Sequence, residues 1–507
     1  MRPRRRPPES SSPVPQLEIG GQPLEQVLLV ISLLLVFSVI GSRFSARAGV
    51  PALLVFLGIG MLAGSEGPGG IDFTSYPLAF GLGSLALAFI IFDGGLRTQW
   101  QSVRPVIGPG ISLASAGVIV TAAVTAAFAW LAFDLTWTQA FLIGAIVSST
   151  DAAAVFSVLR ARSLALKGRV KQLLEFEAGS NDPMAVLLTV SVLAYATATT
   201  SGAAGLAALF ATQIVLGLAL GLLGGRLTVY VINHVGVEYE GLYSVLLFAF
   251  VILLFSLTSV LGGSGFLAVY VAGLQVGNAR LLHKSSLLKF HDGIAWIAQI
   301  VLFLILGLLV FPSQLPPMWL EGLLLSLFLM LVARPLSVLV AAPTRALGWR
   351  ERLFVSWVGL RGAAPILLAT LPWGMGMPNA EYYFNLVFFV VFVSVLAQGT
   401  TIAWLARALG LVEPLREEDE TSAILPAGFV FVDIEVRPAA PAENQQLFEL
   451  RLPSGVVLTS LERGGRFMVP EGQTRFEPGD RMRAFARPSN LELLRETFGD
   501  ARVDETR

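Results

Sequence analysis

The feature that most constrains this 507-residue chain is a succession of long apolar segments joined by short loops. A membrane-spanning helix needs about 20 predominantly apolar residues, and thirteen segments approach that length. Charged residues make up only 14% of the chain, whereas soluble proteins carry about 25%. We therefore predict an all-α polytopic membrane protein with about 13 transmembrane helices. The segments lie near 24–42, 50–64, 77–96, 106–132, 138–159, 172–198, 204–233, 241–261, 263–279, 291–311, 317–342, 351–373 and 382–409.

Lysine and arginine accumulate in cytoplasmic loops, and this bias gives the orientation of the predicted helices. The loops after the first, third, fifth, ninth and eleventh segments are basic, whereas loops after even-numbered segments carry almost no basic residues. This alternation places the N-terminus outside and the C-terminus in the cytoplasm, in the cell inner membrane. Only the basic run Arg2–Arg6 disagrees. A signal peptide is a less favoured alternative, because this run lies far from the first apolar segment.

Composition divides the chain into four parts. Residues 1–23 are rich in Pro, Arg and Ser and predict a disordered N-terminal arm. Residues 24–410 form the transmembrane part, and 411–425 form a linker. Residues 426–500 predict a small α+β cytoplasmic domain. Its expected elements are strands at 429–437, 447–452, 456–461, 466–469 and 481–486 and a helix at 489–498.

Several kinds of site are excluded by residue content. The chain has no cysteine, which excludes disulfides, thiol metal sites and thiol nucleophiles. His234, His283 and His291 share no metal-binding spacing. The net charge of zero conceals an acidic tail, since residues 413–507 hold 18 Asp and Glu against 12 Arg. We expect no cofactor and no nucleic-acid partner.

The fifth segment is interrupted by polar residues near its centre. Apolar sequence at Phe141–Val147 is followed by Ser148, Ser149, Thr150 and Asp151, and apolar sequence then resumes. A charge inside a span is costly and therefore indicates function. A helix broken here would expose backbone carbonyls, which can bind a cation. The alternative is that the hydroxyls bond back to their own helix and Asp151 pairs with a basic residue.

The sixth segment carries Glu177, Asn181 and Asp182 before a long apolar stretch. Glu177 and Asp182 are five residues apart, so their side chains face somewhat different sides of a helix. Apolar residues on both sides place Asp182 well inside the membrane. The alternative is that Asn181 and Asp182 cap a helix that begins at Pro183.

The twelfth segment contains Arg361 between glycines, in the sequence GLRG at 359–362, with Pro365 shortly after. Glycine and proline around a fixed cation predict a kinked or discontinuous helix. A buried arginine keeps its proton and needs an anionic partner. We expect a structural ion pair between Arg361 and Glu177, which leaves Asp182 free to titrate. Pairing of Arg361 with Asp182 would instead occupy that carboxylate.

The two interrupted segments occupy matching positions in the order. Thirteen segments divide into six, one linking segment and six, with the interrupted helix fifth in each half. Halves joined by one extra span have opposite topology, so the interruptions should cross at mid-membrane. Inverted repeats with two discontinuous helices are typical of the binding site of a secondary transporter.

These residues together resemble the monovalent cation:proton antiporter superfamily, in the branch called cation:proton antiporter-1. The resemblance is carried by Asp93-Gly94-Gly95-Leu96 in the third segment and by the motifs described above in the fifth, sixth and twelfth. It covers residues 24–410.

The resemblance implies that Asp182 binds the cation and carries the proton, so that the two ions compete for one carboxylate. Thr150 and Asp151 would contribute a backbone carbonyl and a second carboxylate. Asn181 before the binding aspartate marks the electroneutral branch of the family. Asp93, where the family usually has Glu, would complete the site.

The resemblance also implies the ion pair between Glu177 and Arg361. The family often has a serine ligand at the position of Ala178, and its absence here favours a larger cation such as K⁺. Exchange of Na⁺ for H⁺ is the alternative. Members are commonly homodimers, so we expect a homodimer in membrane lipid.

The tail segments Leu450–Gly455 and Glu477–Asp480 resemble the C-terminal ligand-sensing domain of potassium-channel and potassium-transport regulators. An antiporter with such a module is similar to potassium/proton antiporters of the bacterial cell-volume-regulation type. This implies a role in pH and volume homeostasis and a small nucleotide-type ligand on the domain. A role in assembly only is the alternative.

Two other classes of function remain as alternatives. A ligand-gated cation channel would need a continuous pore lined by repeated polar rings, whereas the carboxylates here cluster on three segments beside one arginine. An intramembrane enzyme could use Asp151 and Asp182 as an acid–base pair. The surrounding sequence lacks the aspartyl membrane-protease signature, and Arg361 would have no role there. We therefore expect a transporter and not an enzyme.

Overall fold

The computed structural model describes residues 18–19, 22–48, 51–73, 75–162, 164–197, 202–342, 347–414, 430–450, 452–453 and 455–503. The chain divides into two compact units, Met1–Leu415 and Arg416–Arg507. We call them the membrane unit and the C-terminal unit. The boundary between them falls within the linker expected at 411–425.

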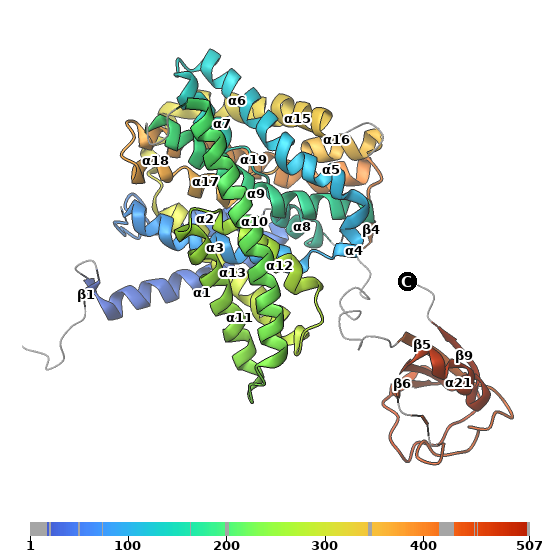
Figure 1. Ribbon diagram of the computed structural model, residues 1–507. Coiled ribbons are helices and arrows are strands. Elements are labelled where there is room, and N and C mark those ends of the chain that lie inside the picture. The colour runs from blue at the N-terminus through green and yellow to red at the C-terminus, as the bar shows by residue number, and fades with distance from the viewer. Residues whose placement is uncertain are drawn as a thin grey trace, which may run out of the picture. The chain divides into compact units, whose positions relative to one another are not determined.

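The membrane unit is a bundle of helices (Figure 1), which confirms the predicted all-α membrane architecture. Each of the thirteen expected segments falls on a helix or on a run of consecutive helices. The helices are α1 (Leu24–Ala48), α2 (Ala52–Ala63), α3 (Tyr76–Arg97), α4 (Trp100–Val103), α5 (Ile107–Ser112), α6 (Val118–Ala132), α7 (Trp137–Ile146), α8 (Ala152–Arg160), α9 (Gly168–Ala196), α10 (Gly202–His234), α11 (Glu240–Val260), α12 (Gly265–Asn278), α13 (Lys284–Leu308), α14 (Trp319–Phe328), α15 (Arg334–Ala341), α16 (Trp349–Trp357), α17 (Ala363–Leu368), α18 (Leu371–Gly374) and α19 (Ala380–Ala408).

Length and composition separate these helices into two groups. Within the described residues, 8 helical stretches are long and apolar enough to cross a membrane. Shorter apolar helices lie at Ala52–Ala63, Trp137–Ile146, Gly265–Asn278 and Ala363–Gly374. α9 is 29 residues long but less apolar, because it carries the polar residues of the sixth segment. The number of thirteen crossings stays a prediction.

Two of the expected spans are discontinuous, as predicted. The fifth consists of α7 and α8, which are separated by residues 147–151, and the twelfth consists of α16 and α17, which are separated by residues 358–362. The side chain of Asp151 caps α8 by accepting a hydrogen bond of 3.2 Å from the backbone N–H of Ala154. α9 runs without interruption through Pro183. The alternative that Asn181 and Asp182 cap a helix starting at Pro183 is therefore wrong.

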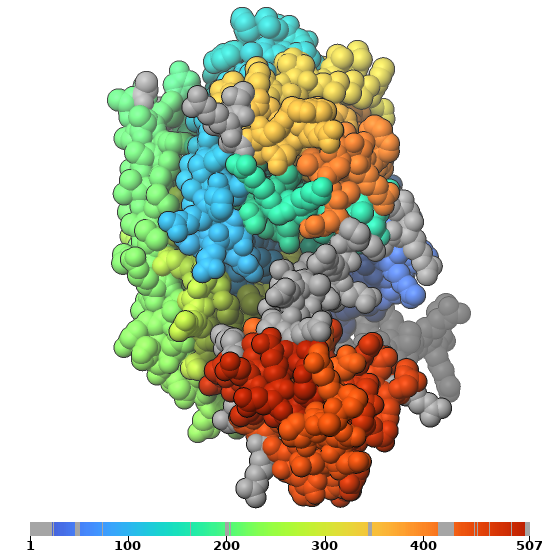
Figure 2. All heavy atoms as spheres, turned by 90° about the vertical axis from the view of Figure 1, so that its right-hand side faces the viewer, coloured from blue at the N-terminus to red at the C-terminus, as the bar shows by residue number. Residues whose placement is uncertain are grey.

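The helix α10 forms an outer edge of the membrane unit, where its side chains run along one side of the space-filling view (Figure 2, green). Only 11% of its most apolar stretch is buried inside the protein. Leu223 and Tyr230 are both 61% exposed. In a bilayer these apolar side chains contact lipid, which is why an exposed apolar surface here is not a defect.

A short antiparallel strand pair ties the end of the membrane unit back onto its interior helices. β3 (Leu164–Leu166) lies between α8 and α9, and β4 (Val412–Pro414) follows α19. The backbone N–H of Lys167 extends the pairing to the carbonyl of Leu411 at 3.0 Å. The first residues of the expected linker are thus a strand, and its residues 415–425 lie outside the described part of the chain.

In its described residues, the C-terminal unit is a five-stranded antiparallel sheet in the order β7-β6-β8-β5-β9, with one α-helix. Alternating residues of β5 (Val432, Ile434, Val436) enter its apolar core, as the period-2 pattern predicted. The predicted sheet-containing domain is therefore confirmed. Its elements are β5 (Val430–Val436), β6 (Val456–Arg463), β7 (Arg466–Met468), β8 (Arg481–Ala486), α21 (Leu491–Phe498) and β9 (Gly499–Val503).

Two details of the expected secondary structure are wrong, and the N-terminal arm expected to be disordered stays a prediction. Residues 447–450 form turns and not a strand, because the N–H groups of Leu447 and Phe448 donate to the carbonyls of Thr474 and Gly472 in a loop. The last strand, β9, was not predicted, since its sequence GDARV is short and mixed in polarity. In the arm expected to be disordered, β1 (Glu18–Ile19) pairs with β2 (Gln22–Pro23). Residues 1–17, like Arg451 and Ser454 of the tail motif, lie outside the described residues.

The helices α3 and α12 approach each other closely through glycines. A Cβ atom at Gly95 would lie 2.5 Å from the backbone oxygen of Tyr270. A Cβ atom at Gly273 would lie 2.5 Å from the backbone oxygen of Phe92. Neither backbone oxygen can move aside as the end of a flexible side chain can. Glycine at both positions is therefore required for this contact, which fixes the end of α3 that carries Asp93.

We predict that Gly95→Ala destabilises the protein and that Gly94→Ala does not. The added methyl at 95 meets backbone and should cost about 1–3 kcal/mol. Nothing lies within 4 Å of a Cβ at Gly94, so alanine there should be neutral or stabilising by up to about 1 kcal/mol. Thermal denaturation of both variants in detergent measures the difference. Equal melting temperatures would contradict the close packing.

Candidate ion-binding site

The two helix interruptions touch each other directly. The backbone N–H of Asp151 donates to the carbonyl oxygen of Leu360 at 2.7 Å. The guanidinium Nη1 of Arg361 donates to the carbonyl oxygens of Ser148, at 3.0 Å, and Ser149. Each break frees backbone groups that have no partner in their own helix, and here each break supplies partners to the other. The expected crossing of the two interrupted segments is confirmed.

The break between α16 and α17 is also held by α19. The hydroxyl of Ser394 accepts a hydrogen bond of 3.1 Å from the backbone N–H of Arg361. The amide of Gln398 donates to the carbonyl oxygen of Trp357 at 2.7 Å. The Ser394 hydroxyl in turn donates to the Gln398 side-chain oxygen at 2.6 Å. The freed backbone groups on both sides of the break are thus satisfied by two side chains of one neighbouring helix.

The glycine after Arg361 has a steric reason. A Cβ atom at Gly362 would collide with the carboxylate of Asp151. Any other residue would therefore push the carboxylate away from the crossing. Gly362 lets the interruption of one helix come into contact with the acidic side chain of the other.

Asn181 fixes the unwound segment beside Asp151. Its side-chain amide donates to the Thr150 hydroxyl at 2.6 Å and to the Thr150 carbonyl oxygen at 3.2 Å. Asn181 is 1% exposed. These hydrogen bonds join α9 to the unwound segment at Thr150. They therefore fix the position of Asp182, the next residue of α9, relative to that segment.

One cavity of about 230 Å³ collects most of the predicted site residues, and we call it the inner cavity. Its lining includes Asp93, Thr150, Asp151 and Asp182, which come from α3, the first interruption and α9. Ala178 also lines it, at the position where a serine ligand was absent from the sequence motif. The structure thus brings four of the five predicted ion-binding residues to one space, with Asn181 behind them.

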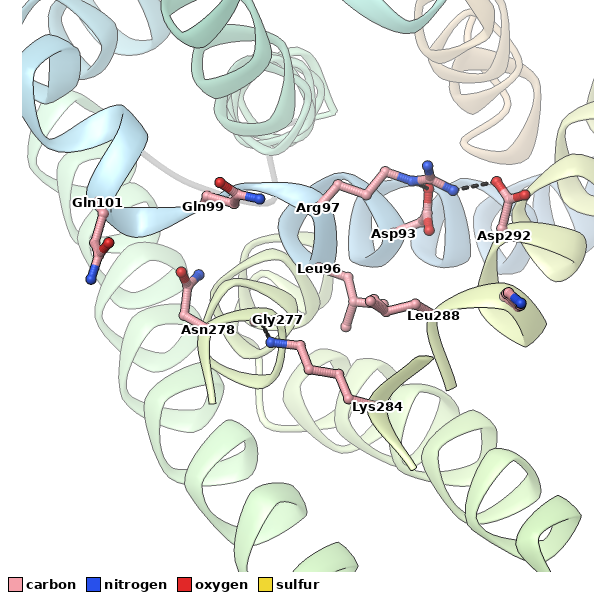
Figure 3. A pocket seen from close by; sticks show the side chains of 11 residues that line it. Asp93, Leu96, Arg97, Gln99, Gln101, Gly277, Asn278, Lys284, Leu288 and Asp292 are labelled. Atoms are coloured by element: carbon pink, nitrogen blue, oxygen red, sulfur yellow. Dashed lines mark hydrogen bonds and ion pairs between the residues drawn. The ribbon is translucent and has the colours of Figure 1, made fainter. Parts of the chain in front are cut away.

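Asp93 is engaged by a basic residue of its own helix. The Arg97 Nε atom lies 2.6 Å from an oxygen of Asp93, and the Arg97 Nη2 atom also contacts Asp292 at the start of α13. Figure 3 shows the guanidinium reaching between the two carboxylates. Arg97 directly follows the third expected segment, 77–96, and so belongs to the basic loop expected there, whereas Asp292 is not among the expected site residues. Asp292 lies beside the first residue of the tenth apolar segment, where a charge inside a span was the available signal.

The expected ion pair between Glu177 and Arg361 is corrected by the structure. Glu177 Oε1 lies 2.6 Å from Nη1 of Arg334, and the two side chains are 1% and 3% exposed. Arg361 instead donates to the carbonyls of the first interruption, although it lies close enough to Glu177 and Asp182 to interact with both electrostatically. Glu177 is therefore the ion-pair partner of Arg334 and not of Arg361.

Arg334 was missed, although a signal for it is present in the sequence. It is the single basic residue within the eleventh apolar segment, directly before Pro335, and it begins α15 after one π-helical turn. A Cβ atom at Gly359 would lie 2.9 Å from the Arg334 Cγ atom. The first glycine of the GLRG motif therefore makes room for Arg334, while the second makes room for Asp151.

We predict that Glu177→Gln and Arg334→Gln each destabilise the protein by about 3–5 kcal/mol, since each leaves one buried charge without its partner. The double variant Glu177→Gln, Arg334→Gln should recover part of that loss. Thermal denaturation in detergent measures all three. The matched control is Glu177→Gln, Arg361→Gln, which should show no recovery. Recovery of stability in the control alone would instead support the pair of Glu177 and Arg361 that we expected from the sequence.

Comparisons with known proteins agree on the family. A family model described as "Sodium/hydrogen exchanger, transmembrane" matches residues 31–408, and one described as "TrkA-C domain" matches residues 431–499. The chain is 42% identical over 488 residues to the K(+)/H(+) antiporter NhaP2 of Shewanella oneidensis, covering 94% of this chain and 84% of that protein. It is 39% identical over 485 residues to the K(+)/H(+) antiporter NhaP of Alkalimonas amylolytica, with the same coverage of 94% and 84%.

The fold has a counterpart among solved structures. The sodium proton antiporter MjNhaP1 from Methanocaldococcus jannaschii superimposes with a TM-score of 0.66 at 21% sequence identity, over 74% of this chain and 99% of that chain. At this identity the likeness concerns the fold alone. The crossed interruptions, the apolar helices and the family match over most of the chain lead to one conclusion: this protein is a multi-pass membrane antiporter of the sodium/hydrogen exchanger family that carries a TrkA-C domain.

Proposed function

We propose that this protein exchanges K⁺ for H⁺ across the cytoplasmic membrane, with Asp182 as the carboxylate for which the two ions compete. The observation that carries the proposal is the inner cavity, in which Asp182 and Asp151 face one space beside the crossed interruptions. A carboxylate shielded from water is stable when it holds a proton or a cation. Either ion, but not both, satisfies one such group.

The charges around Asp182 support its role as the exchanging group. Glu177 is neutralised by Arg334, and Asp93 is in contact with Arg97. Among the ion pairs of the described residues, none includes Asp182 or Asp151. Glu175 also lines the inner cavity outside these ion pairs, but Asp151 and Asp182 are the carboxylates beside the crossed interruptions. We therefore assign the mobile cation or proton to these two, with the carbonyl and hydroxyl oxygens of Thr150 nearby as additional ligands.

The preference for K⁺ rests on two observations. The relatives that match at 39–42% identity are K(+)/H(+) antiporters by name. In addition, Ala178 lines the inner cavity without offering an oxygen, and a weaker ligand field suits the larger and less strongly hydrated ion. Exchange of Na⁺ is the second candidate, since the fold counterpart is a sodium proton antiporter.

Further parts of the proposal concern topology and assembly. The alternation of basic loops supports an N-terminus outside and a C-terminal unit in the cytoplasm, which places Arg97 and the start of α13 near the cytoplasmic side. The exposed apolar surface of helices such as α10 is compatible with a homodimer in lipid, which we propose by likeness to the family.

The C-terminal unit is proposed to regulate exchange and to bind a small nucleotide-type ligand. Its sheet carries a cavity of about 500 Å³ lined by acidic and basic side chains, among them Asp433, Glu462 and Arg481. The chain reaches this unit through β4, which is hydrogen-bonded to the connector between α8 and α9. Asp151 lies at the start of α8 and Asp182 lies within α9. The strand that leads to the C-terminal unit is therefore paired with the connector between the two helices that carry these carboxylates.

We predict that Asp182→Asn abolishes exchange while the protein still folds. The amide can neither release a proton nor balance a cation. The measurement is cation-driven dissipation of a pH gradient in proteoliposomes, with K⁺, Rb⁺ and Na⁺ added in turn. The matched control is Glu175→Gln, which removes another carboxylate of the same cavity and should retain exchange. Proton-coupled flux in Asp182→Asn would refute the assignment, and flux with Na⁺ alone in the wild type would replace K⁺ with Na⁺.

We predict that a protein ending at residue 415 still exchanges cations for protons but responds differently to cytoplasmic K⁺ concentration and pH. The physical reason is that the proposed ion site lies wholly within the membrane unit, whereas the regulatory unit begins after it. Flux in everted vesicles, titrated with K⁺ at several pH values, compares the truncated and full-length proteins. Identical titrations would leave the C-terminal unit a role in assembly only.

A further inference from the structure

The bridge formed by Asp93, Arg97 and Asp292 is the feature that the proposed exchange does not yet explain. Arg97 uses two different nitrogens, with Nε directed at Asp93 and Nη2 directed at Asp292. Figure 3 shows the side chain extending from the end of α3 toward α13 with both contacts made at once. Because the donors are distinct, Arg97 can lose one carboxylate and keep the other.

The bridge stands between two cavities. On one side is the inner cavity with Asp151 and Asp182. On the other side is a larger cavity of about 580 Å³, which we call the outer cavity, lined by the ends of α3 and α12 and the start of α13. Asp93, Arg97 and Asp292 line both cavities. A cation passing from the outer cavity to the inner one therefore passes these three side chains.

Exposure differs along the bridge. The side chain of Asp93 is 14% exposed, whereas those of Arg97 and Asp292 are 54% and 48% exposed. The guanidinium thus reaches from a wet end at Asp292 to a drier end at Asp93. Arg97 thus holds its positive charge against Asp93, the first carboxylate that a cation would meet on entering the inner cavity.

We propose that Arg97 is a tethered competitor of the transported cation, which must displace the guanidinium from Asp93 to enter from the outer cavity. Asp292 is then a positioning residue, since it holds Arg97 when Asp93 is taken by the cation. Because the side chain of Arg97 is 54% exposed, water solvates the guanidinium when it leaves Asp93 and weakens the pair. A diffusing monovalent cation can therefore compete with Arg97 for Asp93. Arg97 therefore sets the apparent cation affinity on this side of the membrane.

The other charges of the outer cavity do not replace Arg97 in this role. Lys284 donates to the backbone oxygens of Gly277 and Ala279, the latter at 3.1 Å, and so is held at the end of α12. Lys289 lines the outer cavity but is in no ion pair with Asp93 among the described residues. Arg160 and Glu175, of opposite charge, line the inner cavity. Among these basic residues, Arg97 is thus the one that forms an ion pair with Asp93.

The inference rests on cation exchange at Asp182, and opposite effects of two neighbouring variants test it. Arg97→Gln removes the competitor, so the K⁺ concentration for half-maximal exchange should fall by about threefold to fivefold, the range of an exposed ion pair. Asp292→Asn leaves Arg97 with Asp93 alone, so that concentration should rise by about the same factor. Everted vesicles containing the full-length protein present the cytoplasmic face to added K⁺ and give both values from pH-gradient dissipation.

Two further variants separate competition from a general charge effect and from a structural role. Lys289→Gln removes a positive charge from the outer cavity without touching Asp93, and should change the half-maximal concentration by less than about twofold. In the double variant Arg97→Gln, Asp292→Asn, the effect of Asp292→Asn should disappear, because Asp292 acts through Arg97. Arg97→Lys keeps a charge that can reach Asp93 and should remain near the wild-type value.

Each outcome decides the inference. Opposite shifts that vanish in the double variant support it. An unchanged or higher half-maximal concentration in Arg97→Gln, shifts of the same sign in both single variants, or an equal shift in Lys289→Gln would overturn it. If Arg97→Gln does not fold, Asp292→Asn and Arg97→Lys still give the predicted rise and the near wild-type value. A wild-type protein without K⁺-dependent proton flux would instead refute the proposed function.

Discussion

The membrane unit depends on the way in which two broken helices satisfy each other. A bilayer offers no water to unpaired backbone groups, so a break inside a span persists only where protein groups replace the lost helical hydrogen bonds. Here the N–H of Asp151 uses the carbonyl of Leu360, and Arg361 covers the carbonyls of Ser148 and Ser149. Asp151 and Thr150 therefore line the inner cavity, with Thr150 held in place by Asn181. Without the crossing, the N–H of Asp151 and the carbonyls of Ser148 and Ser149 would lose the partners that they have in this structure.

Fixed charges around the crossing are the basis on which we propose Asp182 as the exchanging group. Burying one charge is costly unless an opposite charge accompanies it, and the pair of Glu177 and Arg334 meets that condition with both side chains almost fully enclosed. Arg361 donates through Nη1 to two backbone carbonyls, whose partial negative charges stabilise it without an ion pair. The arrangement leaves Asp182 beside a cavity and not in an ion pair. An exchanger needs such a group, because a carboxylate locked to arginine could accept neither a cation nor a proton.

The sequence could predict which residues are buried and charged, but not always which of them touch. Polar residues and glycines inside apolar segments indicated both interruptions and their crossing, because such residues are costly in a bilayer and the spans that contain them hold matching positions. The predicted partner of Glu177 was wrong because Arg334, the one arginine of the eleventh apolar segment, was not considered as a buried cation. Pairing depends on the rotation and depth of three helices, which periodicity does not specify. Arg97 was assigned to a loop for a related reason: the last turn of α3 extends beyond the apolar stretch and carries a side chain long enough to reach back to Asp93.

The connection between the two units follows from the same backbone requirement. The short strand β3 joins α8, which begins after Asp151, to α9, which contains Asp182. Its free edge is paired by β4, the first segment after α19, and an unpaired strand edge is otherwise a site for unwanted association. The segment that leads out of the membrane unit is therefore hydrogen-bonded to the connector between the two carboxylate-bearing helices. This pairing is a structural basis for the proposal that the C-terminal unit regulates exchange.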